Sequence, residues 1–392
     1  MGRLLIKNAV IPTENKLKQV DLLAVDGLID RIGVGLDQPE ESVTVIDASD
    51  AILLPGFIDI HTHGGAGVEI NDADVDGLHQ LGRFLASHGV TGYLPTIITD
   101  TADRTLHCIS TIVKAKNAPC DGASILGIHL EGPYLAAAYK GAMPEHLLRS
   151  PSIDELAGYL QAADGCFMHM TVSPELPGMP AFIRAATEMG ISVALGHTGA
   201  DYQTALDCIH AGANCSTHTF NAMKLPHQHE PAACGAILES DVYCEAICDG
   251  LHLHPAIVRL LLKTKGYDRV IAVTDAMMAA GLGDGNYHLG VNKIVVEKGD
   301  AMLEDRSSRA GSTLTMSAAL RNLAKFTNKP FYELAALLTS NPAEFIGLGA
   351  YKGRLEKGFH ADMTMLDLNG DIIATFVNGM CVYRKEACYG PS

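Results

Sequence analysis

The pattern of hydrophobic and polar positions changes twice along the chain. Residues 1–54 consist of short apolar runs separated by polar turns, such as LLIKNAVI, VDLLAV and VTVIDA, and none of them keeps a 3.6-residue period. The same texture returns near the C-terminus in ADMTMLDL and IIATFVNGMCVY, where Asn378-Gly379 is a typical hairpin turn. Because such runs predict strands, we expect one small β-sandwich domain built from residues 1–54 and 346–392.

Between these ends, residues 55–345 alternate apolar, strand-like runs with amphipathic helical stretches. Eight runs begin near Gly56, Gly92, Ile125, Phe167, Ile191, Asn214, Val242 and Val270. Helical stretches follow most of them, although the sixth, PAACGAILES, is short and interrupted by glycine. Eight such units predict an α/β fold of the (β/α)₈ TIM-like barrel type, which typically needs ~250 residues. A doubly wound sheet is the alternative, but it would gather its polar residues at one switch point.

Polar residues that can bind metals lie on many of these runs. Asp59, His61 and His63 alternate with period two, so all three side chains point to one face of a strand, which in a barrel is the interior. A carboxylate or an imidazole also closes the third, fifth, sixth and eighth runs: Glu131, His197, His218 and Asp275. These are the C-terminal ends of the strands, where barrel enzymes build their active sites.

A lone buried histidine is more often a packed core residue than a ligand, and we interpret His129 and His169, which lie within strands below the rim, in that way. We expect Asp59 to orient a ligand rather than to bind an ion. Six candidate ligands on equivalent strand ends instead predict one or two divalent cations, and Zn²⁺ and Fe²⁺ both fit the donors: His61, His63, Glu131, His197, His218 and Asp275.

The composition of the chain limits the classes of binding partner that we expect. The 392 residues are 47% hydrophobic, which is enough for one large core. The formal net charge is −16 and the basic residues are scattered, so we expect a small-molecule partner and neither nucleic acid nor an anionic membrane. We see no leader peptide at the N-terminus and no run of about 20 apolar residues, and we therefore expect a cytoplasmic protein.

Seven motifs, in this order and spacing, carry a family resemblance: PGFIDIHTHG, HLEGPY, GHTGA, THTFNAM, DGLHLHP, VTDAM and GSTLTM. The chain resembles the N-acetylglucosamine-6-phosphate deacetylases of the amidohydrolase superfamily over nearly its whole length. The resemblance implies a homodimer that hydrolyses N-acetylglucosamine 6-phosphate to glucosamine 6-phosphate and acetate.

The resemblance also implies roles for single residues. Glu131, His197 and His218 match the ligands found throughout the family, His61 and His63 match a pair that some members lack, and Asp275 matches the catalytic carboxylate. The residues that match substrate contacts are Ala142, Asn221, Ala222, His252, Arg309, Ala310 and Gly311.

Two positions depart from the family pattern. Family members typically have Arg-Glu-Pro-Gly, whose Arg grips the phosphate, where this chain has His229-Glu230-Pro231-Ala232, and we expect His229 to take over this contact. Many members have His where this chain has Met143.

Two alternative functions remain open from the sequence. One is an amidohydrolase that acts on another N-acetyl amino sugar or another amide, and the other is a non-catalytic barrel, although a scaffold would need neither the ligand set nor Asp275.

Overall fold

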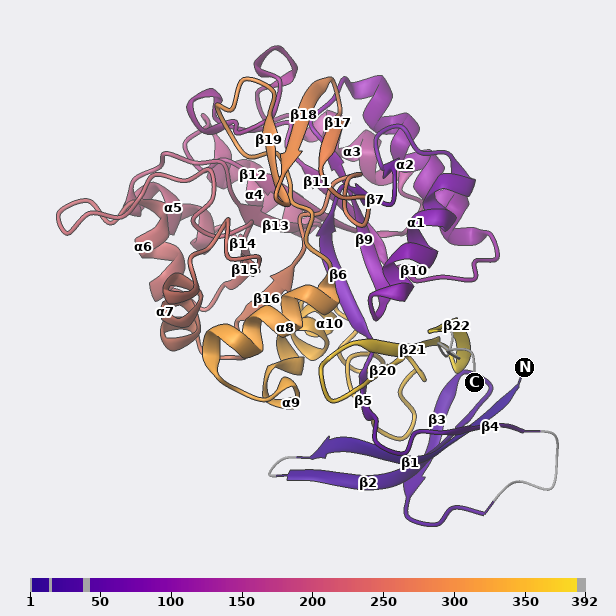
Figure 1. Cartoon of the computed structure of the whole chain (residues 1–392). Helices are drawn as coiled ribbons and strands as arrows, with labels where there is room; N and C mark the ends of the chain where they lie inside the picture. The colour runs from indigo at the N-terminus through magenta and orange to yellow at the C-terminus, as the bar shows by residue number, and fades with distance from the viewer. Residues whose placement is uncertain (1, 14–15, 38–42, 386–392) are drawn as a thin grey trace.

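The computed structural model describes residues 2–13, 16–37 and 43–385. Parallel strands form a closed barrel in the middle of the chain, which confirms the predicted fold (Figure 1). Neighbouring strands pair in chain order, and the backbone N–H of Asp275 closes the ring by donating to the carbonyl of His61 at 2.8 Å. The eight strands are β6 (Phe57–Thr62), β9 (Val90–Ile98), β11 (Gly127–Glu131), β12 (Phe167–Val172), β13 (Ser192–Leu195), β14 (Cys215–Ser216), β15 (Tyr243–Ile247) and β16 (Val270–Val273).

One helix follows each barrel strand, including the weakly predicted sixth unit. The helices are α1 (Val75–Ser87), α2 (Ala102–Asn117), α3 (Ile153–Ala162), α4 (Met179–Glu188), α5 (Tyr202–His210), α6 (Ala232–Glu239), α7 (Pro255–Lys265) and α8 (Met316–Thr327). Helix α1 shows how the sequence sets these boundaries. The side chain of Asp74 caps its first turn by accepting from Gly77 N at 2.8 Å, and Leu78, Leu81 and Leu85 are buried on the face toward the barrel.

The two chain ends form a second sheet, with the order β22-β21-β20-β5-β1-β2-β3 and with β4 paired to β1. Its strands enclose an apolar core of their own, and this sheet lies beside the barrel in Figure 1. Asn378 and Gly379 have positive φ values, 48° and 73°, in the turn between β21 and β22, which confirms the predicted hairpin. The strands are β1 (Arg3–Thr13), β2 (Lys16–Val25), β3 (Leu28–Gly33), β4 (Thr44–Asp47), β5 (Ile52–Pro55), β20 (Met363–Leu366), β21 (Ile372–Val377) and β22 (Met380–Arg384).

A third, antiparallel sheet lies between β16 and α8 along the chain, where no element was expected from the sequence. It consists of β17 (Gly285–Leu289), β18 (Asn292–Glu297) and β19 (Asp300–Leu303). The remaining short elements are β7 (Gly64–Gly65), β8 (Val68–Glu69), β10 (Ser124–Ile125), α9 (Phe331–Leu334), α10 (Ser340–Phe345) and three single-turn 3₁₀ segments at Ala137–Tyr139, Glu145–Leu147 and Ala335–Leu338. Within the described ranges, every helix is too short or too polar to cross a bilayer.

Candidate active site

Three of the candidate ligands enter the C-terminal mouth of the barrel from an unusual backbone conformation at the ends of their strands. His197, His218 and Asp275 follow β13, β14 and β16 and have φ values of 48°, 29° and 49°. This left-handed region is costly for residues other than glycine, and such strain concentrates at functional sites. The turn directs each side chain into the mouth of the barrel.

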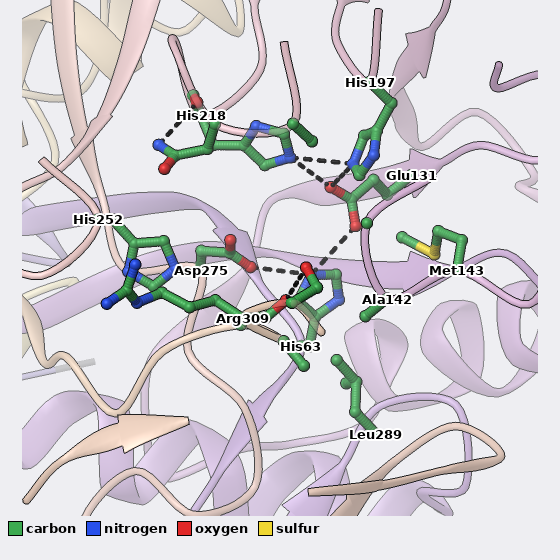
Figure 2. A pocket seen from close by; sticks show the side chains of 16 residues that line it. His63, Glu131, Ala142, Met143, His197, His218, His252, Asp275, Leu289 and Arg309 are labelled. Atoms are coloured by element: carbon green, nitrogen blue, oxygen red, sulfur yellow. Dashed lines mark hydrogen bonds and ion pairs between the residues drawn. The ribbon is translucent and has the colours of Figure 1, made fainter. Parts of the chain in front are cut away.

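Glu131, at the end of β11, joins two groups of side chains. Its Oε1 lies 3.1 Å from the Nε2 atoms of both His197 and His218, while its Oε2 lies 3.3 Å from Nε2 of His63 (Figure 2). Asp275 belongs to the second group, because its Oδ1 lies 3.1 Å from Nε2 of His63 and 3.5 Å from Nε2 of His61. The six predicted ligands therefore form two adjoining sets: His61, His63 and Asp275 in one, and Glu131, His197 and His218 in the other. Glu131 also contacts His63 of the first set.

The donor chemistry of these sets fits a cation. Nδ1 of His63 faces the carbonyl of Thr96 at 3.1 Å, and Nδ1 of His61 faces a Glu245 oxygen at 2.9 Å. Because both partners only accept, each Nδ1 carries a proton, so in the neutral imidazoles, the form that binds a metal, the two Nε2 lone pairs face each other across 3.3 Å. Two acceptors at that distance repel each other unless a cation lies between them, and Nε2 is a common metal donor.

The second set shows the same arrangement. Nδ1 of His197 donates to the carbonyl of Tyr139 at 2.9 Å, so its Nε2 presents a lone pair to Nε2 of His218 at 3.0 Å and to Glu131. All the atoms of each set lie within 4.8 Å of one another, and every residue involved is buried. The residues present therefore fit one or two divalent ions.

The carboxylates and imidazoles of the site shift one another's pKa values. Burial lowers the pKa of His63, but the Asp275 and Glu131 carboxylates outweigh it and raise that pKa to about 10 in the metal-free chain. Burial raises the pKa of Asp275, yet the His61 and His63 imidazoles bring it below the usual value. Without an ion, the site thus favours positive charge among its carboxylates, which is the charge that a cation supplies.

Glu245 is the main residue of the site that was not expected from the sequence. It is fully buried on β15, and its Oε2 accepts from Nδ1 of His61 and from the backbone N–H of His218, both at 2.9 Å. It therefore fixes one ligand from each set. A single carboxylate in the apolar run VYCEAIC was the available signal.

The other buried polar residues below the mouth support the ligands. Asp59 accepts from the backbone N–H groups of His61 and Thr274 at 3.3 Å, so it holds backbone rather than an ion, and burial raises its pKa to about 6. His129 lies between the hydroxyls of Thr96 and Thr171, and burial holds its pKa well below the usual value. These contacts agree with the supporting role expected of Asp59 and the packing role expected of His129.

The mouth opens into a pocket of about 230 Å³, which admits a small molecule and no folded partner. The predicted site residues line it, except His61, which is buried behind the mouth, and His229. His229 is exposed on the segment between β14 and α6, outside the pocket of its own chain. The lining residues are His63, Glu131, Gly141, Ala142, Met143, His197, His218, Asn221, Ala222, His252, Asp275, Leu289, Ser308, Arg309, Ala310 and Gly311.

One side of the pocket is polar, and two of its side chains, Arg309 and His252, already contact carboxylates. The Nε and one terminal nitrogen of Arg309 donate to Asp300 at 2.8 Å, which leaves the other terminal nitrogen free of that carboxylate. Nδ1 of His252 contacts Asp249 at 2.6 Å, and its Nε2 remains available. Arg309 and His252 are thus each oriented by a carboxylate, while part of each side chain can still contact a ligand.

A closed (β/α)₈ barrel whose mouth gathers imidazoles and carboxylates around a small pocket defines a metal-dependent hydrolase. The chain belongs to the amidohydrolase family, whose profile matches residues 52–383, and within it to the N-acetylglucosamine-6-phosphate deacetylases.

Relatives of that name are similar over most or all of the chain. The N-acetylglucosamine-6-phosphate deacetylase of Bacillus subtilis is 33% identical over 98% of both chains, and that of Vibrio furnissii is 34% identical over 86% of this chain and 85% of its own. A substituted form of the Mycobacterium smegmatis enzyme, solved in complex with N-acetyl-D-glucosamine-6-phosphate, superposes with a TM-score of 0.89 at 31% identity, covering 97% of this chain and 100% of that one.

Proposed function

We propose that this chain hydrolyses the N-acetyl amide of N-acetylglucosamine 6-phosphate to glucosamine 6-phosphate and acetate. The observation that carries the proposal is the convergence of His63, Glu131, His197, His218 and Asp275 on one pocket. The same pocket is lined by all the residues that the family resemblance matches to substrate contacts, except His229: Ala142, Asn221, Ala222, His252, Arg309, Ala310 and Gly311. The similarity to deacetylases over nearly the whole chain supports the same reaction.

Amide hydrolysis needs an activated water and a stabilised oxyanion, and a divalent ion held by these ligands supplies both when bound. Asp275 supplies the proton transfer. Its carboxylate lies at the pocket edge of the ligand cluster, where it accepts the proton of the attacking water and then delivers it to the leaving nitrogen. Because Asp275 is anchored through its backbone to the carbonyl of His61, the base keeps a fixed place beside the ligands.

The polar side of the pocket recognises the sugar phosphate in this proposal. Arg309 is a permanent cation, and His252 presents Nε2 toward the same space. The side-chain amide of Asn221 donates to the carbonyl of His218 at 3.0 Å, so its oxygen stays free for a sugar hydroxyl. Gly311 has a φ of 62°, and a Cβ there would lie 3.0 Å from the carbonyl oxygen of Asp275, so glycine keeps this wall open.

We further propose that the ions are Zn²⁺ or Fe²⁺, one or two per chain, and that the enzyme is a cytoplasmic homodimer. The mixed imidazole and carboxylate donors suit both metals. The dimer follows from the family resemblance, and it would offer His229 a phosphate to contact, because His229 lies outside its own pocket.

The direct test is acetate release from N-acetylglucosamine 6-phosphate by the purified, metal-loaded protein. A panel should add N-acetylglucosamine, N-acetylmannosamine 6-phosphate and an N-acetyl amino acid. We expect the highest kcat/KM for the 6-phosphate of N-acetylglucosamine. Equal efficiency on the unphosphorylated sugar would remove the phosphate from the proposal, and preference for the amino acid would remove the sugar.

A further inference from the structure

One side of the pocket is apolar, in contrast to the polar side described above. It consists of Ala142, Met143 and Leu289, which we call the acyl wall. Met143 and Leu289 are 5% and 4% exposed and belong to one apolar cluster with Ile98 and Leu135. In Figure 2 these three residues lie on one side of His63 and Asp275, and His252 and Arg309 lie on the other.

The acyl wall is held in place from two directions. The side-chain amide of Asn292, at the start of β18, donates to the carbonyl of Ala142 at 2.7 Å. The backbone N–H of Gly290 donates to Oε1 of Glu69, whose Oε2 lies 3.0 Å from Nε2 of His288. These bonds fasten the β17–β18 turn, and with it Leu289, over the mouth of the barrel.

His63 and Asp275 lie between the polar side of the pocket and the acyl wall. This position determines which part of the substrate faces which side. The amide carbon must lie beside Asp275, and the sugar phosphate requires the polar side, which carries the permanent charge of Arg309. The acyl group, on the far side of the carbonyl, is then left facing the apolar side. We propose that Met143 and Leu289 form an acyl-binding subsite that selects a short, apolar acyl group, an inference that rests on the deacetylase function proposed above.

The subsite predicts both the size and the polarity of the acyl group that the enzyme prefers. Its side chains offer no hydrogen-bond donor to an acyl group, so a hydroxyl added to the acetyl methyl loses its water and gains no partner. Apolar pockets discriminate against one added hydroxyl by about 10²-fold and against one misplaced methylene by about 10- to 200-fold. The parent should therefore prefer acetyl over glycolyl, and acetyl over propanoyl and butanoyl.

The test compares glucosamine 6-phosphate carrying acetyl, propanoyl, butanoyl or glycolyl groups, all of which release the same free amine. We expect Met143→Ala to raise the ratio of kcat/KM for butanoyl over acetyl by at least about tenfold, because truncation opens space for the longer chain. Leu289→Ala, on a different element, should move the ratio in the same direction. Thermal unfolding and metal content of each variant show whether fold and ligands are intact.

Two controls make the outcome specific. Met278→Ala truncates a methionine that packs against the same apolar cluster but does not line the pocket, and Arg309→Ala changes the opposite side of the pocket. Both variants should leave the acyl ratio within about twofold of the parent. An acyl ratio that neither Met143→Ala nor Leu289→Ala changes would overturn the acyl wall. A parent that releases no amine from the acetyl substrate would instead overturn the proposed function.

Discussion

At the scale of single residues, the period-two pattern of β6 and the polar ends of the other strands could be read from the sequence. They predict His61, His63 and Asp275 as site residues because strand geometry alone fixes the face and the end on which a side chain lies. Glu245 could not be assigned in this way. Its role depends on two partners, His61 and His218, that lie 184 and 27 positions away.

Asp275→Asn tests the proton acceptor. The amide keeps the size of the side chain but cannot accept the proton of water, so kcat should fall by about 10²- to 10⁴-fold. Metal content and melting temperature should stay close to those of the parent. Activity within tenfold of the parent, with intact metal content, would assign proton transfer to another residue.

Glu245 is predicted to act on the ligands it positions. Glu245→Gln keeps an oxygen that can accept from both His61 and His218, whereas Glu245→Leu removes it. We therefore expect the Leu variant to bind metal about 10- to 100-fold more weakly, as is typical for a lost partner of a ligand, and the Gln variant to stay closer to the parent. Titration against a chelator of known affinity measures this. Equal affinities in all three proteins would show that Glu245 serves only packing.

At the scale of elements, the eight strands and the weak sixth crossover were predictable, but the reason why α6 forms was not. Helix α6 is short, and it begins at Ala232 with a φ of 53° and no side-chain cap. Its end is stabilised by Lys265 of α7, whose ammonium donates to the carbonyls of Ile237, at 3.0 Å, and Ser240. A cation at a helix C-terminus is favourable, and here it comes from another element.

Lys265→Met tests that contact. The substitution keeps most of the apolar stem and leaves two carbonyls without their donor, which costs about 1–3 kcal/mol per unsatisfied buried group. We expect the midpoint of urea unfolding to fall while metal content stays unchanged. An exposed lysine of the same helix, Lys263→Met, is the matched control. Equal midpoints in both variants would mean that α6 does not depend on Lys265.

The number of ions bound per chain tests the histidine pair at the end of β6. His61→Asn combined with His63→Asn removes one ligand set and leaves Glu131, His197 and His218 in place. If both sets bind ions, bound metal should drop by about one equivalent per chain and activity should fall with it. Elemental analysis after gel filtration gives the count. An unchanged count would make the pair structural.

At the scale of the whole molecule, the sequence indicated a barrel and a terminal sheet, and both are present. It did not indicate the β17–β19 sheet, although NYHL and NKIVVE alternate in the way that strands do. The position of that sheet depends on contacts far along the chain, such as those of Glu69 and Ala142 with its β17–β18 turn. The division into residues 1–54 with 346–392 and residues 55–345 remains a prediction.

The position of His229, outside the pocket of its own chain, leads to a prediction about the assembly of subunits. Its loop projects from the barrel between β14 and α6, and an ion pair at 2.8 Å between Lys224 and Glu230 links the two ends of the loop (Figure 1). If His229 contacts the phosphate of a substrate bound to a second subunit, His229→Ala should raise KM about tenfold, or ~1.4 kcal/mol, with little change in kcat. Light scattering should then show a dimer.

Mixing subunits separates that arrangement from a contact within one chain. Hybrids of His229→Ala with Asp275→Asn contain one site that combines an intact Asp275 with the intact His229 of the other subunit. The low KM should return in that fraction of sites. Arg309→Ala should not recover when mixed in the same way, because Arg309 lines the pocket of its own chain. If the hybrids keep the raised KM of His229→Ala, His229 acts within its own chain and not across a subunit interface.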